Sequence, residues 1–178
     1  MEEKVFESCI AQIIKKDQDS QNALRQIYDA YHGYVFHLCL SILNHREDAE
    51  DVASDFFIRL WQKADTYVPG NGHRAWIGRI VHNMSIDYLR KKQKQQNQIS
   101  IEEQTEIEDP GAMNQVEENM QVTQILSTLP QDQREVVHLK VFGELTIDQI
   151  SKILNIPVTT AAWRYRQGIK NLRKTIAK

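Results

Sequence analysis

Apolar side chains recur three and four residues apart along most of the chain, and no stretch alternates regularly between apolar and polar residues. The clearest stripe spans about 21–43 and consists of Leu24, Ile27, Tyr28, Tyr31, Val35, Leu38, Cys39 and Ile42. This spacing matches the 3.6 residues of an α-helical turn and not the two-residue repeat of a strand. The pattern therefore predicts an all-α protein.

Interruptions of this pattern divide the first half of the chain into a series of helices. The expected helices cover about 3–15, 21–43, 49–64 and 74–94. The strongest turn signal in the chain is Pro69-Gly70-Asn71-Gly72, which separates the last two. We expect these helices to form one compact bundle.

Composition changes after this bundle. Residues 93–120 carry seven acids and one base and include Asp109-Pro110-Gly111. A segment with so little apolar area is typical of a flexible linker. The sequence therefore predicts two small helical domains with the boundaries 1–94, 95–119 for the linker, and 120–178.

The second domain has the pattern of a helix-turn-helix. Pro130 opens a helix that ends near Gly143, and the hydroxyl oxygen of Thr146 can accept amide hydrogen bonds at the start of the next one. After Asn155-Ile156-Pro157, a basic helix is expected over about 158–176. A short helix, a tight turn and a longer basic helix are typical of proteins that place the second helix in a DNA major groove.

The final helix separates into two faces on a helical wheel. The side expected to face the domain core consists of Val158, Ala161, Tyr165, Ile169, Leu172 and Ile176. The opposite side carries cations for phosphates and donors for base edges. An exposed Trp163 is expected there, although packing against a neighbouring helix is an alternative for this side chain.

The net charge of −2 conceals a strong segregation of charge. Residues 47–55 carry five acids and no base, whereas residues 74–94 carry six bases against one acid. Residues 157–178 carry six bases and no acid. Each basic segment can attract phosphate locally, so binding to nucleic acid is favoured over two solvated helix faces.

Other classes of protein find little support. The acidic N-terminus lacks the pattern of a secretion signal, and no apolar run reaches the length of a membrane span. Cys9 and Cys39 are expected to be reduced core residues of a cytoplasmic protein. No metal-ligand spacing, phosphate-binding glycine loop or nucleophile motif is present, so we expect no catalytic residues, no cofactor and no metal site.

Two sets of motifs resemble a known family. Asp48-Ala49-Glu50-Asp51-Val52, Phe57-Ile58-Arg59-Leu60-Trp61 and Arg74-Ala75-Trp76-Ile77 resemble region 2 of extracytoplasmic-function (ECF) sigma factors. Leu129-Pro130, Gln133-Arg134-Glu135-Val136 and Ile153-Leu154-Asn155-Ile156 resemble region 4 of the same family. Both sets occur in the family's order, which is more specific than a helix-turn-helix alone.

The resemblance implies a transcription initiation factor with three binding surfaces. Core RNA polymerase would contact Asp48, Glu50, Asp51, Ser54, Asp55, Ile58 and Trp61. The opened −10 promoter element would contact His73, Arg74, Trp76, Arg79, Asn83 and Arg90. The −35 element would contact Thr159, Thr160, Trp163, Arg164, Arg166, Gln167, Lys170, Arg173 and Lys174. The family also implies an anti-sigma factor as a partner.

The residues themselves leave some alternatives open. A helix-turn-helix regulator with an N-terminal dimerisation or sensing bundle would share much of this pattern, and an adaptor bundle is a further possibility. Ile58 and Trp61 could be an ordinary amphipathic edge, and Trp76 could be a core residue. The sequence departs from the family at Ala162 and Trp163, which replace polar residues, and at Ser54, which replaces glutamine.

Overall fold

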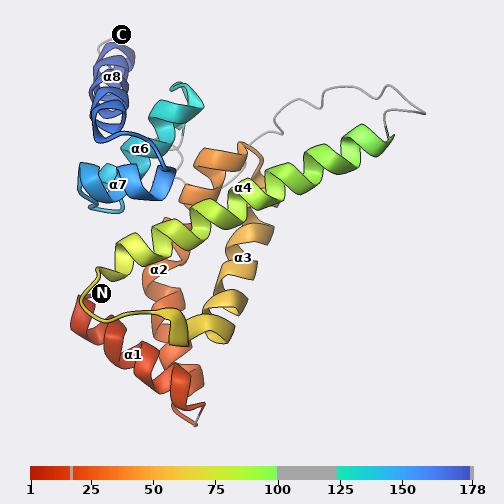
Figure 1. Cartoon of the computed structure of the whole chain (residues 1–178), viewed down its shortest axis with the longest axis vertical. Coiled ribbons are helices and arrows are strands. Elements are labelled where there is room, and N and C mark those ends of the chain that lie inside the picture. The colour runs from red at the N-terminus through yellow and green to blue at the C-terminus, as the bar shows by residue number, and fades with distance from the viewer. Residues whose placement is uncertain (17, 100–123, 177–178) are drawn as a thin grey trace.

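The computed structural model describes residues 1–16, 18–99 and 124–176, and every regular element in these ranges is helical (Figure 1). The helices are α1 (Glu3–Lys15), α2 (Ser20–Leu43), α3 (Arg46–Lys63), α4 (His73–Ile99), α6 (Gln131–Val141), α7 (Ile147–Leu154) and α8 (Val158–Ile176), with a 3₁₀ turn at Ala64–Thr66. The all-α prediction is confirmed. The expected linker lies mostly in 100–123, outside the described residues.

Helix ends follow local signals. α7 begins with a reciprocal capping box, in which Thr146 and Gln149 satisfy each other's backbone amides. α2 and α7 end at Asn44 and Asn155, both in the left-handed conformation that asparagine tolerates at such positions. α4 continues to Ile99, five residues past the expected end at 94, because lysine and glutamine are good helix formers even without an apolar face.

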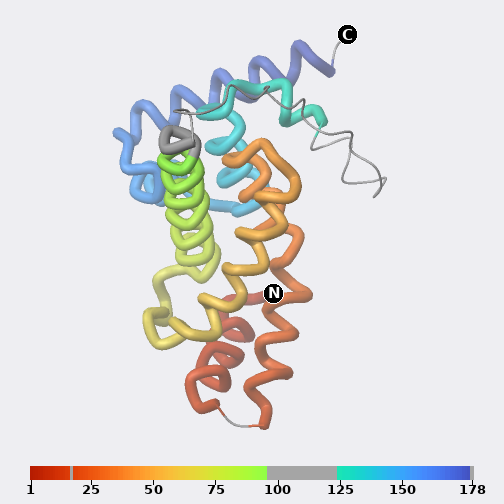
Figure 2. The backbone as a smooth tube through the Cα atoms, turned by 90° about the vertical axis from the view of Figure 1, so that its right-hand side faces the viewer, coloured from red at the N-terminus to blue at the C-terminus, as the bar shows by residue number. Residues whose placement is uncertain are grey.

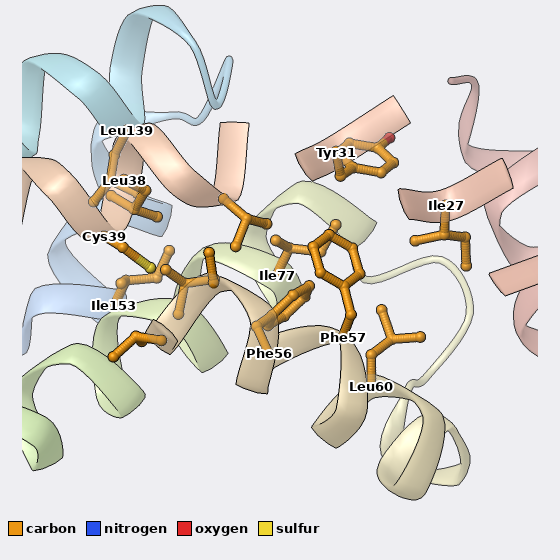
Figure 3. Packing of buried hydrophobic residues seen from close by; sticks show 14 of the residues in the cluster. Ile27, Tyr31, Leu38, Cys39, Phe56, Phe57, Leu60, Ile77, Leu139 and Ile153 are labelled. Atoms are coloured by element: carbon orange, nitrogen blue, oxygen red, sulfur yellow. The ribbon is translucent and has the colours of Figure 1, made fainter. Parts of the chain in front are cut away.

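Helices α1 to α4 form a bundle with α2 at its centre. α2 packs against α1, α3 and α4, and the bundle closes around fully buried side chains (Figure 3). These include Phe6, Ile27, Leu38, Phe56 and Ile77. Cys9 and Cys39 are free and buried, as expected.

Helices α6 to α8 form the second unit. α8 crosses α6 at Gly168, where a Cβ atom would lie only 2.7 Å from a methyl group of Val137. The expected core face of α8 is only partly right. Ala161 is buried, but Val158 and Ile176, which lie at the two ends of α8, are exposed.

The two units share a single hydrophobic core. α6 packs against α2, and α7 packs against α4. Figure 2 shows the second unit at the end of the bundle away from α1. Leu139 and Ile153 of the second unit both approach the backbone of Gly78 in α4 (Figure 3). Polar contacts surround this junction: a 2.5 Å hydrogen bond joins His82 to Glu135, and Arg134 donates to Asn44 over 2.8 Å.

Buried His138 makes this junction sensitive to acid. Its ring stacks between Tyr34 of α2 and Phe142, and burial, reinforced by the neighbouring His37, lowers its pKa to about 3. The folded chain therefore keeps His138 neutral at a pH where an unfolded histidine is protonated. The effect of His138 on the unfolding free energy is absent above pH 6.5, and it lowers that free energy progressively between pH 6.5 and about 3.

We expect His138→Phe to remove this acid sensitivity. Between pH 7 and pH 5 the unfolding free energy of the natural chain should fall by about 2 kcal/mol more than that of the variant, at about 1.4 kcal/mol per pH unit below 6.5. Urea unfolding at several pH values measures the difference. Parallel pH profiles for the two proteins would contradict the assignment.

Candidate polymerase and nucleic-acid interfaces

An exposed apolar and acidic surface lies on α3. Ile58 keeps 58% of its surface exposed, and Trp61 is half-buried. Ile58 lines a shallow groove between α3 and α4 together with Asp55, Arg59, Gln62, Lys63 and Met84. An apolar anchor with a charged rim is the composition of a protein-binding surface.

The acids of α3 do not all belong to this surface. Glu50, Asp51 and Asp55 are exposed, and the hydroxyl of Ser54 donates to the Glu50 carbonyl. Asp48 instead points toward α4, where it accepts hydrogen bonds from Tyr88 (2.8 Å) and Lys92 (2.7 Å). The expected surface position of Asp48 is thus corrected to a buried one.

Burial alone would raise the pKa of Asp48, but the contacts from Lys92 and Tyr88 outweigh it and hold the pKa below its usual value. Asp48 is therefore ionised at neutral pH and joins α3 to α4. These contacts link the helix that carries Ile58 to the helix that carries the basic face.

Residues 67–72 form the loop before α4, and aromatic side chains pack beneath it. Gly70 and Gly72 have φ of +82° and +77°, which favour glycine, and Val68 to Asn71 are exposed. Tyr67 and His73 lie beneath the loop and are buried. The expected DNA-facing position of His73 is corrected, because its Nε2 is hydrogen-bonded to the hydroxyl of Tyr31 and its ring stacks on Phe6.

Trp76 occupies an intermediate position. It is half-buried, with ring edges against Phe6 and Tyr67. Part of its surface remains available beside the loop. Trp76 is therefore neither a fully buried core residue nor a fully exposed residue, which were the two alternatives that the sequence left open.

One face of α4 presents polar and cationic groups to solvent. Arg79, Asn83 and Arg90 are exposed. Arg74 is less free, because it donates to the Phe142 carbonyl (3.1 Å) and lies 3.4 Å from Glu144 of the second unit. Cations spaced along a helix beside a loop suit the backbone of a single strand.

The free face of α8 is cationic with one large aromatic side chain. Trp163 is 51% exposed, which confirms the expected exposure, and Thr159 and Arg166 are also exposed. The later exposed cations are Lys170, Arg173 and Lys174, whereas Thr160 and Gln167 are half-buried. Arg164 lies 3.2 Å from Asp132 of α6, so it joins the two helices rather than pointing outward.

Other kinds of site are not found in the part of the chain that the structure describes. Within 1–16, 18–99 and 124–176, no group of three or more potential metal ligands comes together. None of the helices searched in these ranges is both long and apolar enough to cross a membrane.

Residues that the sequence motifs did not identify hold the loop before α4 and the junction between the two units in place. Glu3 and Glu7 of α1 accept hydrogen bonds from the loop before α4. Glu135 and Glu144 pair with the bundle across the junction. The four-residue spacing of Glu3 and Glu7 places them on one helix face, but no pattern in the sequence identifies backbone amides 63 and 69 residues away as their partners.

A helix-turn-helix with a basic second helix, joined to a helical bundle with a separate apolar and acidic surface, is typical of DNA-binding proteins of the transcription-factor class. Comparison with protein-family models agrees with this class. Residues 27–95 match Sigma-70 region 2, and residues 119–172 match Sigma-70, region 4. The chain belongs to the ECF family of RNA polymerase sigma factors, which are bacterial transcription initiation factors.

Individual relatives match over nearly their whole length. The ECF sigma factor SigW of Bacillus subtilis is 31% identical, and the match covers 98% of both chains. The ECF sigma factor RpoE of Cereibacter sphaeroides is 25% identical, with 89% of each chain covered.

Solved structures show the same fold. RpoE of Bartonella quintana, in complex with the anti-sigma factor NepR, gives a TM-score of 0.66 at 18% identity, covering 86% of this chain and 96% of that one. CnrH, in complex with the cytosolic domain of CnrY, gives 0.63 at 19% identity, covering 97% of both chains.

Proposed function

We propose that the chain binds core RNA polymerase through α3 and directs it to promoters through the loop before α4, α4 and α8. The observation that carries this proposal is the physical separation of three surfaces: an apolar and acidic one on α3, a cationic face on α4 and a cationic face on α8. A sequence-specific initiation factor needs one protein contact and two DNA contacts. A regulator with a sensing bundle needs no exposed anchor such as Ile58.

The domain boundaries belong to this proposal. We assign 1–94 to region 2, with α4 extending to Ile99, and 120–178 to region 4, joined by 95–119. The activity is that of a non-enzymatic factor that acts in the cytoplasm with the polymerase.

We also propose an anti-sigma protein as a partner. Both structural neighbours are sigma factors seen in complexes, RpoE with the anti-sigma factor NepR and CnrH with the cytosolic domain of CnrY. In this chain, two candidate surfaces for such a protein are the α3 groove and a groove on α8 lined by Tyr165, Ile169 and the cations Arg166, Lys170, Arg173 and Lys174.

Reconstituted transcription tests the main proposal. The purified chain is added to bacterial core polymerase free of sigma factors, with a library of promoter fragments as template. We expect transcripts that start at a defined subset of promoters. Specific binding to promoter duplex as a dimer, without any polymerase-dependent transcripts, would favour the regulator.

We expect the early and late parts of α8 to contribute differently to DNA binding. Thr159, Trp163 and Arg166 lie in its first half, where recognition helices meet base edges, whereas Lys174 lies where phosphates are the neighbours. Trp163→Ala or Arg166→Ala should cost about 1–3 kcal/mol on the preferred −35 sequence and less on scrambled DNA. Lys174→Gln should weaken binding to both DNAs about equally and lower the salt slope by about one.

Binding titrations on matched and scrambled duplexes at several salt concentrations measure both effects. Equal losses on the two DNAs for Trp163→Ala and Arg166→Ala would show that this face of α8 does not read bases.

A further inference from the structure

We propose that α1 is a positioning element for promoter opening, in which Glu3 and Glu7 hold the loop over residues 67–72 in the shape that receives unpaired −10 bases. The proposal rests on the function proposed above for this loop. The match to Sigma-70 region 2 begins at residue 27, so α1 lies outside it.

The contacts are specific and directed at the loop backbone. Glu7 Oε1 accepts from the Gly70 amide over 2.8 Å, and also from the Tyr67 hydroxyl over 3.3 Å. Glu3 Oε1 accepts from the Gly72 amide over 3.0 Å. Glu3 and Glu7 are one helical turn apart on the same face of α1, so one rigid helix fixes two amides that lie two residues apart.

Both ends of the loop are anchored, by buried Tyr67 and by hydrogen bonds from the first turn of α4 to the Gly72 carbonyl, but its middle has few other contacts. Its two glycines adopt positive φ, and the side chains from Val68 to Asn71 are exposed rather than packed. Within the loop itself, the Asn71 amide bonds to the Val68 carbonyl over a long 3.4 Å. A glycine-rich segment without packing samples many conformations, so hydrogen bonds to ionised carboxylates contribute strongly to its order.

α1 also fixes the point at which the loop enters α4. Phe6 is fully buried and stacks on His73, the first residue of α4, with ring centroids 4.9 Å apart. The same ring meets the edges of Tyr67 and Trp76. The space outside the loop is open, since a Cβ atom built on Gly70 would meet nothing within 4 Å. α1 therefore contacts one side of the loop, and the opposite side is open at Gly70.

Removing a negative charge distinguishes a positioning role of Glu3 and Glu7 from simple electrostatic repulsion between these carboxylates and DNA. Carboxylates near a DNA-binding loop repel phosphate, so removing one should strengthen binding if electrostatics alone mattered. Positioning predicts the opposite result for base-specific binding. Glu7→Ala should therefore lose discrimination between sequences at the −10 element although the chain becomes less acidic.

The test uses holoenzyme formed with the full chain and two fork-junction DNAs with a single-stranded −10 element. One DNA carries the −10 sequence of a promoter that the natural holoenzyme transcribes, and the other carries a substituted sequence. We expect Glu7→Ala to reduce the affinity ratio between the two DNAs by roughly tenfold, and Glu3→Ala by less, because Glu7 accepts two hydrogen bonds.

Two further variants and two control measurements complete the design. Glu7→Gln keeps an acceptor oxygen and should restore most of the discrimination. Glu2→Ala makes the same charge change at an exposed position with no side-chain cap contact and should match the natural chain. Core affinity and Tm should change little in all of them, since alanine and glutamine favour the helix.

A Glu7→Ala holoenzyme that discriminates as well as Glu2→Ala, or that binds both DNAs more tightly with an unchanged ratio, would overturn the proposal. Failure of the natural holoenzyme itself to discriminate would instead refute the function proposed for the loop.

Discussion

Replacing Ile58 by glutamate is expected to weaken binding to core RNA polymerase by roughly thirtyfold or more, which corresponds to the 2 kcal/mol or more of an interface hot spot. Ile58 is the most exposed apolar side chain of the α3 groove, so a carboxylate there remains solvated in the free protein. Burying the same carboxylate against polymerase carries a large desolvation cost. Titration of labelled core polymerase measures the affinity, and Tm reports the fold.

Ile14→Glu is the matched control. Ile14 is a 47% exposed isoleucine on α1 of the same bundle, outside the groove. It should change neither polymerase affinity nor Tm appreciably. Equal losses of affinity in the two variants would mean that α3 carries no polymerase contact, and unfolding of Ile58→Glu would mean that Ile58 belongs to the core.

Gly168→Val is expected to abolish specific −35 binding by separating α8 from α6. A Cβ atom at Gly168 would stand 2.7 Å from a methyl group of Val137, which is closer than two carbon atoms can pack, so α6 and α8 must move apart locally. Overpacking of this kind typically costs about 1–3 kcal/mol, and the bulk of valine places this site at the upper end. Hydrogen exchange should show lost protection in α6 and α8 while the core of α1 to α4 stays protected.

Gly33→Ala provides the opposite control. Gly33 lies in the middle of α2, and a Cβ atom added there would meet nothing within 4 Å, so alanine should stabilise the chain by about 0.5–1 kcal/mol.

Unchanged −35 binding in Gly168→Val would show that α8 need not lie against α6.

Much of the fold could be predicted because helical periodicity and local end signals are properties of neighbouring residues. The starts and ends of α1, α2 and α8 fall within one or two residues of the expected positions, and Thr146 caps α7 as its spacing predicted. The exposure of Trp163 followed from the same helical spacing. These features depend on sequence separations of a few residues.

Contacts between distant segments could not be predicted in this way. Asp48 and His73 fit surface motifs in the sequence, yet Tyr88 and Tyr31, both 40 or more residues away, draw them inside. The contacts of α1 with the loop before α4 depend on backbone amides, which every residue except proline possesses, so they leave no sequence signal. The same applies to Arg74, whose partner Glu144 comes from the other unit.

The shared core has a consequence for how this factor spans a promoter. Elements centred near −10 and −35 are about 25 base pairs apart, or roughly 85 Å of duplex at 3.4 Å per base pair. In the docked arrangement Leu139 and Ile153 of the second unit lie against Gly78 of α4, so the reach of each unit is tied to that of the other. The 24 residues from 100 to 123 span on the order of 80 Å at full extension, so the chain length permits separation.

Under the function proposed above, the docked arrangement is one of two states, and polymerase that engages both units on promoter DNA is expected to select the other. Leu139 and Ile153 then lose their neighbours in the bundle, and their apolar surface needs a new cover. The affinity of the intact chain for polymerase consequently measures a difference, namely the free energy of binding to polymerase less the free energy of opening the shared core.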